Sequence, residues 1–403
     1  CACFNFGKST NRLTSIFLMN YPLQGIRVLE LARVLAGPWV GQTLSDLGAD
    51  VIKIESPNGD ETRKWGPPFI EGKNGTLDSA YFHSCNRGKR SMVLDFKRKQ
   101  DLQILNKLIL KSDIIIENFK VGGLKKYKLD YDSVSNLNPK LIYCSITGFG
   151  QSGPYSQRLG YDFIIQGLSG IMDLTGDPDG EPQKMGVAFA DIFTGLYGVI
   201  AIQSALRLRE QNGKGQHLDL SLMDSMVSVL ANQASNYFAS GVSPKRLGNK
   251  HPNIVPYQVF PVKDGHLIIA VGNNEQFNRF CEAIDLDYLK TIDKYNDNKK
   301  RVKNRDELVE IIKIKTRQYN KKELQILLEK NDVPIGSVNE VKDVFNDPQV
   351  KSRNLKIKMP HNAAKTKSTF GLRTPIIFSD TKLNLERGVP LLGEHNDEIL
   401  KEL

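Results

Sequence analysis

The sequence predicts an α/β protein with a mostly parallel main sheet, because short apolar strands alternate with helices over the first 240 residues. Strands are expected at 26–31, 50–55, 91–96, 113–119 and 141–147. A Gly37-Pro38 turn opens a helix that runs to about Leu47, and leucines at helical spacing predict a second helix at 98–111. This alternation implies a sheet covered on both faces, in a Rossmann-like large domain at 21–240.

A smaller α+β domain is expected at 254–345. Before it, the large domain ends with an apolar helix around 192–200, a strand at 217–222 and a long helix at 223–240. Polar residues 241–253 form a linker, and the segment 257–271, broken by Asp264-Gly265, is typical of an antiparallel hairpin. Further elements are expected as helices at 275–285 and 305–329, a second linker at 346–384, and a C-terminal segment at 385–403 that returns to the large domain.

The charge of the chain does not indicate a nucleic-acid partner. Lysines and arginines exceed acids by ten, but they are spread along all 403 residues, with acids of similar density among them. Nucleic-acid binders gather such charge on one face, so a lysine-rich surface and a small anionic partner fit better. No apolar run approaches the length of a membrane span, and we expect no membrane partner.

The spacing of the cysteines and the composition of residues 1–20 indicate the cellular compartment of the protein. The pattern predicts reduced thiols and argues against a disulfide framework or a metal site, because the five cysteines are odd in number and scattered; they are Cys1, Cys3, Cys85, Cys144 and Cys281. Residues 1–20 are basic and contain no acid, which is typical of a mitochondrial transit peptide. Alternatively, Met19 is the true start and the preceding residues are upstream sequence, which would favour the cytoplasm.

Asp191 is the only carboxylate between Glu181 and Glu210, and it lies where an apolar helix begins. One interpretation is a helix N-cap, a role in which aspartate is common. The other is a nucleophile, kept ionised by the positive end of the helix and shielded from water by apolar neighbours, since the helix should be buried. Position alone favours the cap.

Three further motifs could bind a ligand. The glycines Gly148, Gly150 and Gly153 follow a strand but are not followed directly by a helix, so a close-lying loop fits better than a dinucleotide site. Lys89 and Arg90 precede a strand, and they have two interpretations: a clamp for a phosphate group, or ordinary solvated charge. Asn118 lies near the end of a strand, where ligands of parallel sheets bind, although asparagine is also a common turn residue.

Several segments together resemble the class III CoA-transferases of the CaiB/BaiF type. They are 22–30, 47–55, 117–119, 145–150, 160–162 and 186–195, with a weaker likeness at 390–395. Segments 254–258 and 271–277 are most similar to members that act on dicarboxylic acids. The resemblance implies a nucleophilic Asp191, an acyl-CoA thioester as substrate, a carboxylate as second substrate, no permanently bound cofactor, and an interlocked homodimer.

The same resemblance implies which residues contact CoA. The matching positions are Val34, Ala36, Leu94, Lys97, Asn118, Lys126 and Tyr161. Two features depart from the family pattern: Ser56 stands where relatives have arginine, and only Gly248-Asn249 remains of a glycine-rich lid loop.

The expected reaction is the transfer of CoA from succinyl-CoA to glutarate or 3-hydroxymethylglutarate, through an aspartyl anhydride and an aspartyl-CoA thioester. Backbone N–H groups in 148–153 are candidate oxyanion donors. Arg158, Arg246 and, more weakly, His251 are candidates to bind the far carboxylate of the acceptor. Two alternatives stay open. One is a 2-methylacyl-CoA racemase, disfavoured because Tyr161 stands in place of a histidine base, and the other is a non-catalytic CoA-binding protein.

Overall fold

The computed structural model describes residues 21–403, so the expectations for residues 1–20 lie outside the described residues. Contacts divide the chain into two compact units. Unit 1 holds the chain up to Ser145 together with Gly198–Leu218 and Ile357–Leu403, and unit 2 holds Ile146–Tyr197 and Asp219–Lys356. The predicted mixed α/β fold with a parallel central sheet is confirmed.

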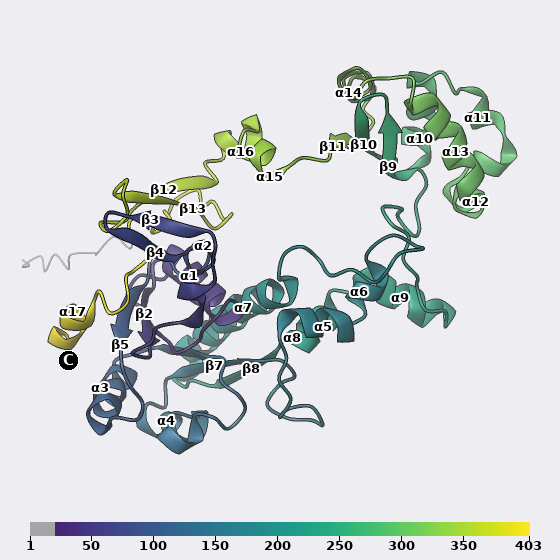
Figure 1. Ribbon diagram of the computed structural model, residues 1–403. Helices are drawn as coiled ribbons and strands as arrows, with labels where there is room; N and C mark the ends of the chain where they lie inside the picture. The colour runs from purple at the N-terminus through teal and green to yellow at the C-terminus, as the bar shows by residue number, and fades with distance from the viewer. Residues whose placement is uncertain (1–20) are drawn as a thin grey trace, which may run out of the picture. The chain divides into compact units, whose positions relative to one another are not determined.

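The central sheet has six strands in the order β5-β2-β1-β6-β7-β8. β5, β2, β1, β6 and β7 pair in parallel along this order (Figure 1). Their bounds are β1 Arg27–Glu30, β2 Asp50–Glu55, β5 Arg90–Val93, β6 Ile114–Glu117, β7 Ile142–Thr147 and β8 His217–Ser221. The chain leaves the edge strand β5 and returns beside β1 as β6, so the strand order reverses between β1 and β6. In open parallel sheets, ligands bind at the carboxyl ends of the strands beside such a point.

Helices cover both faces of this sheet. Leu29, Ile52 and Met92 point to one face, where apolar side chains of α3 (Lys99–Leu110), α4 (Tyr131–Leu137) and α17 (Asn396–Lys401) complete a buried core. The helix α1 (Ala36–Asp46) packs on β1, β2 and β6. Burial of both faces explains why the strands are almost continuously apolar.

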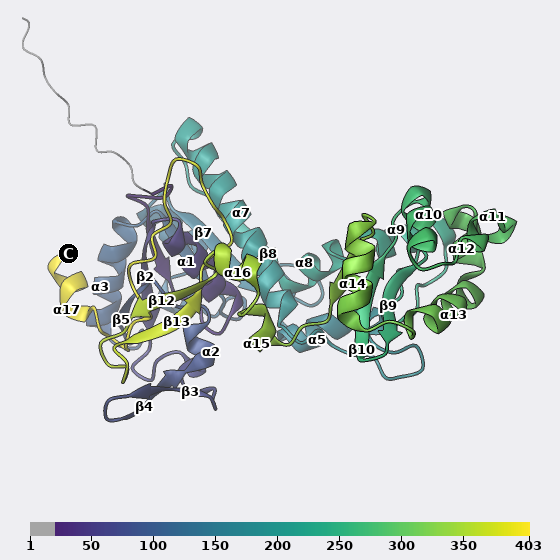
Figure 2. The same ribbon diagram turned by 90° about the horizontal axis from the view of Figure 1, so that it is seen from above.

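The C-terminal segment lies against the first strands of the chain (Figures 1 and 2). Within unit 1, α17 contacts β5, and Arg90 forms ion pairs with Glu398 and Glu402. The hairpin β12–β13 (Lys356–Pro360, Ser368–Leu372) precedes it, and its loop forms a bridge from Ala364 to Gly72 of the hairpin β3–β4 (Phe69–Gly72, Gly75–Ser79). The sequence patterns did not predict either hairpin.

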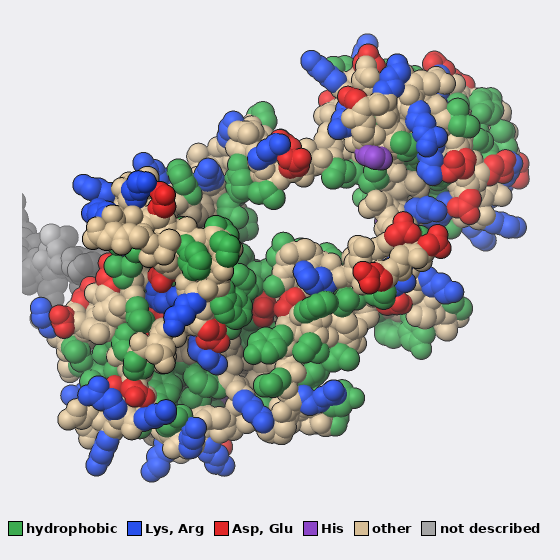
Figure 3. Space-filling model, in the orientation of Figure 1, with side chains coloured by type: hydrophobic (Ala, Val, Ile, Leu, Met, Phe, Trp, Pro, Cys, Tyr) green, Lys and Arg blue, Asp and Glu red, His purple; other side chains and the backbone are tan. Residues whose placement is uncertain are grey.

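Unit 2 contains a second hydrophobic core within residues 255–333. Its antiparallel sheet has the order β11-β10-β9, and β9 (Tyr257–Val262) pairs with β10 (Gly265–Ala270) as the predicted hairpin. Three helices pack here: α10 (Asn274–Ala283), α13 (Arg305–Thr316) and α14 (Lys321–Lys330). β11 spans Ile335–Ser337. On the surface of this region, basic and acidic side chains lie side by side (Figure 3), unlike a basic nucleic-acid stripe.

Two helices expected to be continuous are each divided in two. The region 223–240 forms α8 (Leu222–Ser228) and α9 (Ala231–Ser240), and Ala231 at their junction has a left-handed φ of 47°. The region 305–329 forms α13 and α14, because Asn320 and Glu323 make a capping box that starts a new helix.

The helix α7 (Phe189–Asn212) begins earlier and is more exposed than expected. Leu196, Tyr197 and Ile200 are 43%, 41% and 59% exposed, so its apolar surface is only partly covered in a single chain. Among residues 21–403 it is also the one helix long and apolar enough to cross a membrane, with 44% of its most apolar window buried. The expectation that no apolar run reaches that length is therefore wrong. Core helices meet the same criterion, and we assign α7 no membrane role.

Candidate active site

A cavity of about 260 Å³, which we call the strand-end pocket, opens at the carboxyl ends of β1, β2, β5 and β6 in unit 1. Its aromatic side is formed by Phe96, Phe119 and Tyr127, with the Phe96 ring 5.7 Å from that of Tyr127. Polar groups line the rest, among them Arg33, Lys53, Ser56, Asp60 and Lys97. An apolar wall with a few convergent polar groups is typical of a small-molecule site.

The loop between β1 and α1 is fixed at one side of this pocket. Asn118 holds it from β6: its side chain accepts from Arg33 N at 2.9 Å and donates to Arg33 O at 2.6 Å. Val34, the next residue, has φ 71°, a conformation that β-branched residues adopt only when the surroundings impose it. Asn118 thus acts on the backbone of the loop rather than as a simple turn residue.

Six of the predicted CoA contacts gather around the strand-end pocket. Leu94 and Lys97 line the pocket. Val34 belongs to the loop at its side, Ala36 begins the helix that follows this loop, and Asn118 holds the loop through Arg33. The Lys126 ammonium lies 4.8 Å from the ring of Tyr127, which lines the pocket. Tyr161 belongs to unit 2, where its side chain is 63% exposed.

The phosphate clamp expected at Lys89 and Arg90 is contradicted. Lys89 is fully buried, where it pairs with Glu30 and donates to Asn86 Oδ1 and Pro38 O. Arg90 is 3% exposed and pairs with Asp50, Glu398 and Glu402. Both cations are neutralised inside unit 1, so neither can meet a phosphate from solvent.

Asp162, rather than Asp191, caps the N-terminus of α7. Asp162 Oδ2 accepts hydrogen bonds from Ala190 N at 2.8 Å and Asp191 N at 3.4 Å. Its other oxygen accepts from Gln166 Nε2 at 2.7 Å within α5 (Asp162–Leu168). Within the described part of the chain, no hydrogen bond reaches the Asp191 carboxylate. The capping interpretation of Asp191 therefore fails, and its oxygens are available for chemistry.

The protonation of Asp191 differs from the expectation of a permanently ionised group. Burial and, to a smaller extent, the neighbouring negative charge of Asp162 together raise the pKa of Asp191 to about 7. The carboxyl is thus poised to change charge near neutral pH, as is common for catalytic groups.

This pKa predicts that any reaction in which the Asp191 carboxylate is the nucleophile depends on pH. A carboxylate must be ionised to attack a carbonyl, so kcat/KM should fall about tenfold per pH unit as the pH drops below about 7. A pH–rate profile of kcat/KM between pH 5 and 9, at constant ionic strength, measures this directly. A profile that stays flat down to pH 5 would contradict it.

The loop after β7 is not a free set of oxyanion donors. Gln151 N donates to both carboxylate oxygens of Asp219, at 2.9 and 3.1 Å, and Gly150 N donates to Thr147 Oγ1 at 2.9 Å. These two N–H groups are occupied, which removes them from the candidates. No helix opens directly from the glycines, as expected: residues 149–161 are turns and irregular chain before α5.

The close approach of two backbone segments explains Gly148. A Cβ at Gly148 would lie 2.6 Å from the Cα of Gly160, so only glycine permits this contact. The contact holds the loop after β7 next to the residues that lead into Asp162.

Of the candidates for an acceptor carboxylate, Arg158 is the most available. Arg246 forms an ion pair with Asp173 and donates to the carbonyls of Asp177 and Gly180, which fixes a loop of unit 2. His251 packs on the Tyr257 ring, and its Nδ1 accepts from Asn253 N. Arg158 is exposed and its guanidinium lies 4.5 Å from the Tyr155 ring centre, with no ion pair to any residue of 21–403.

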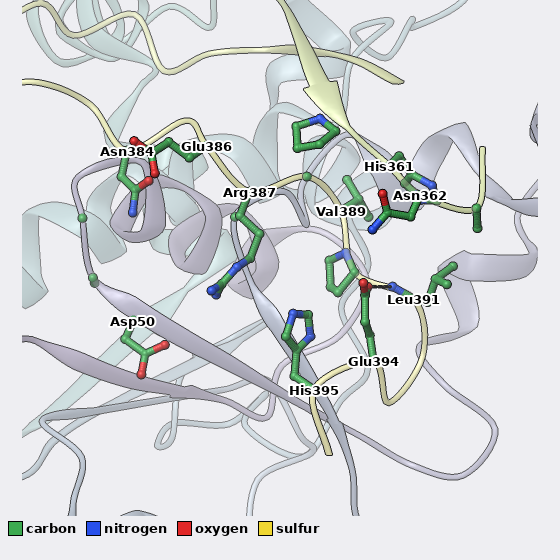
Figure 4. Close-up of a pocket in the computed structure, with 17 residues that line it drawn as sticks. Asp50, His361, Asn362, Asn384, Glu386, Arg387, Val389, Leu391, Glu394 and His395 are labelled. Atoms are coloured by element: carbon green, nitrogen blue, oxygen red, sulfur yellow. Dashed lines mark hydrogen bonds between the residues drawn. The ribbon is translucent and has the colours of Figure 1, made fainter. Parts of the chain in front are cut away.

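A second cavity, of about 490 Å³, lies at the opposite ends of the strands of unit 1. Gly48, Ala49 and Asp50 line it where β2 begins, and Arg387 from the C-terminal segment points into it between Asp50 and His395 (Figure 4). Glu386 and Glu394 also line it. None of the predicted site residues lies here, and the amino ends of parallel strands are not where such sheets bind ligands.

Comparisons with known proteins identify the family of the chain. The family model described as CoA-transferase family III matches residues 23–396. The chain belongs to CoA-transferase family III. It is 53% identical over 384 residues to a succinate–glutarate CoA-transferase of Agrobacterium fabrum, covering 95% of this chain and 96% of that relative.

Other relatives and solved structures agree with the assignment. The chain is 41% identical over 383 residues to the human succinyl-CoA:glutarate CoA-transferase, covering 95% of this chain and 86% of the human protein. A crystal structure of a CAIB/BAIF family protein from Brucella suis has a TM-score of 0.85 and 56% identity, covering 95% of this chain and 99% of that one. The protein is thus a class III CoA-transferase.

Sequence reasoning missed Asp162 as the cap of α7, and Lys53 and Asp60 beneath the loop before α1. Asp162 was visible as part of the segment Gly160-Tyr161-Asp162, but its contact with α7 joins residues 28 positions apart. Lys53 lies in an otherwise apolar strand, and a lysine within such a strand is the signal that could have drawn attention to it.

Proposed function

We propose that the protein transfers CoA from succinyl-CoA to glutarate or 3-hydroxymethylglutarate, with Asp191 as the nucleophile. The observation that carries this proposal is the partly buried Asp191 carboxyl, which has a pKa of about 7 and accepts no hydrogen bond from any described residue. Succinyl-CoA and glutarate come from the names of the relatives at 53% and 41% identity, and 3-hydroxymethylglutarate comes from the family resemblance of the sequence.

Each half of the reaction uses the same chemistry. The Asp191 carboxylate attacks the thioester carbonyl of succinyl-CoA, the C–S bond breaks, and an anhydride and the CoA thiolate form. The thiolate attacks the aspartyl carbonyl and releases succinate, leaving an aspartyl-CoA thioester. The acceptor carboxylate then reverses the sequence, which frees Asp191 and yields the new acyl-CoA. One thioester replaces another, so no ATP and no resident cofactor are needed.

Water must be kept from Asp191 because it would hydrolyse the anhydride. The burial that raises the pKa of Asp191 supports this route. For the CoA moiety we propose the strand-end pocket of unit 1, whose aromatic side suits a base and whose Lys97 suits a phosphate. Arg158 is our candidate for the free carboxylate of the acceptor.

A homodimer is part of the proposal. In unit 2, α5 exposes Phe163, Ile164 and Leu168 at 57%, 49% and 48%, and hydrophobic side chains are visible on its surface in Figure 3. The first turns of α7 add Leu196 and Tyr197. Monomers seldom leave so many large apolar side chains uncovered, so a second copy of the chain is the expected cover, interlocked as in the family that the sequence resembles.

The compartment also stays a proposal. We propose a mitochondrial matrix location, which rests on the basic, acid-free composition of residues 1–20.

The direct test is an exchange assay. Incubation with succinyl-CoA and isotope-labelled glutarate should yield labelled glutaryl-CoA and free succinate without ATP. Pentanoate, which is glutarate with one carboxylate replaced by a methyl group, is the matched control and should react at least about tenfold more slowly, because its methyl end cannot pair with the Arg158 guanidinium. Exchange of the acyl α-proton with solvent but no acyl exchange would point to a racemase, and CoA binding with neither would point to a binding protein.

A further inference from the structure

Four charged side chains that the transfer chemistry does not use lie beneath the loop between β1 and α1. Glu30, Lys53 and Lys89 are fully buried, and Asp60 is 1% exposed. Glu30 Oε1 accepts from Lys53 Nζ at 3.0 Å and from Lys89 Nζ at 2.8 Å. Lys53 Nζ also lies 3.0 Å from Asp60 Oδ2. We call this set the buried charge cluster.

The buried charge cluster is tied to the backbone of the loop. Lys53 Nζ donates to Ala32 O at 2.9 Å, and Asp60 Oδ2 accepts from Val34 N at 3.3 Å. Lys89 Nζ donates to Pro38 O, in the first turn of α1, at 2.9 Å. The cluster therefore fixes Ala32 and Val34, on both sides of the Arg33 backbone that Asn118 holds.

The loop needs such restraint because its conformation is strained. Val34, at φ 71°, occupies the left-handed region, which costs a β-branched residue free energy relative to extended backbone. Without the bonds to Ala32 O and Val34 N, the loop would relax to a commoner conformation. Its side of the strand-end pocket would then move.

Stability alone does not account for the cluster. A buried ion pair is frequently no more stable than apolar side chains of the same volume, since desolvation offsets the attraction. Burial disfavours the charged form of Lys53, but Glu30 and Asp60 outweigh this and raise its pKa, so the lysine stays a cation. A cation at this position provides something that a methionine could not, namely donors aimed at Ala32 O and Asp60.

We propose that Lys53, together with Asp60, is a positioning residue for acyl-CoA binding: it holds the strained loop 31–35 in the conformation that shapes the strand-end pocket. This inference rests on the proposed function for its ligand. It assigns Lys53 no contact with the reacting atoms, so its loss should alter binding of CoA much more than the chemical step.

The test uses the full-length protein and two variants. Lys53→Met removes the cation, and Asp60→Asn replaces the acceptor of Val34 N with an amide group while it preserves shape, in case Lys53→Met does not fold. Both should raise the KM for succinyl-CoA and the Kd for CoA by about tenfold or more, with kcat changed less than about threefold. Hydrogen exchange of the peptide that contains Val34 should become faster in both.

The matched control is Arg87→Met. It breaks another buried ion pair of unit 1, between Arg87 and Asp46, whose side chains are 4% and 1% exposed, without touching the loop. It should leave KM, Kd and exchange at Val34 as in the wild type. The proposal is overturned if Asp60→Asn binds CoA normally, or if Arg87→Met raises KM equally. A wild type that neither binds nor transfers CoA would refute the proposed function, and exchange at Val34 would still decide whether the cluster holds the loop.

Discussion

Replacing Asp191 with asparagine is expected to reduce CoA transfer by at least about 10³-fold, because the amide cannot form the anhydride on which the route depends. The fold should be unaffected, since no described residue donates a hydrogen bond to the Asp191 carboxylate. Steady-state exchange between succinyl-CoA and glutarate measures the loss. Mass spectrometry of the wild type trapped with hydroxylamine should detect an adduct at Asp191 that the variant lacks.

The stability of the Asp191→Asn variant provides an independent check. The folded-state pKa of about 7 exceeds the ordinary value of 3.8, so the folded protein retains this proton as the pH rises and the unfolded chain releases it. The cost of Asp191 to stability therefore grows between about pH 4 and 7 and remains in full above pH 7, and the variant escapes that cost. Relative to the wild type, it should gain about 1–2 kcal/mol between pH 5 and pH 8, a figure reduced for partial exposure to solvent.

Asp162→Asn is the control for Asp191→Asn, because Asp162 is the neighbouring acid and caps α7. It should lose stability because one oxygen that caps α7 becomes an amide donor facing Ala190 N and Asp191 N. If Asp191→Asn kept more than a tenth of the activity, or if its stability did not change with pH relative to the wild type, the nucleophile would have to be sought elsewhere.

The sequence was sufficient to predict the parallel sheet, and it singled out Asp191 as a candidate nucleophile. β2 begins and ends at the predicted residues because alternation and apolar character are local properties. Asp191 drew attention as a lone acid in an apolar stretch, but the family resemblance, not its position, favoured a nucleophile over a cap. The cations at 89 and 90 were misassigned for the opposite reason: Arg90 meets Glu402, which is 312 positions away, and local sequence carries no record of such a partner.

The roles of Asp162, Lys53 and Asn118 also required the fold. Each contacts a backbone group that a different element brings near, such as Ala190 N, Ala32 O or Arg33 N. A type of residue and its neighbours in sequence can indicate that it is polar and buried, but not which loop it holds. The family resemblance supplied candidate CoA contacts, and the structure shows that two of them, Asn118 and Val34, shape the loop at the side of the strand-end pocket.

A methyl group at Gly41 should destabilise the protein although it favours the helix. Gly41 lies within α1, where glycine to alanine ordinarily stabilises by about 1 kcal/mol. Here the new Cβ would lie 1.8 Å from Glu30 Oε2 and 3.3 Å from Lys89 Cε. Both side chains are held by the buried charge cluster, so α1 or Glu30 must move. We expect Gly41→Ala to lose about 3 kcal/mol and to lower the thermal midpoint by roughly 8 °C.

Gly167→Ala in α5 isolates the effect of the contact from that of helix propensity. A Cβ at Gly167 meets only Met172 Sδ at 3.6 Å, an ordinary contact, so this variant should be as stable as the wild type or slightly more stable. Thermal unfolding of both variants at one pH gives the comparison. The Cβ added at Gly41 would displace Glu30 without touching the strand-end pocket. Because Glu30 holds Lys53, and Lys53 holds the loop 31–35, Gly41→Ala should also weaken CoA binding. Equal stability of the two variants would mean that Glu30 and α1 can separate, and the cluster would then lack the rigidity needed to hold a strained loop.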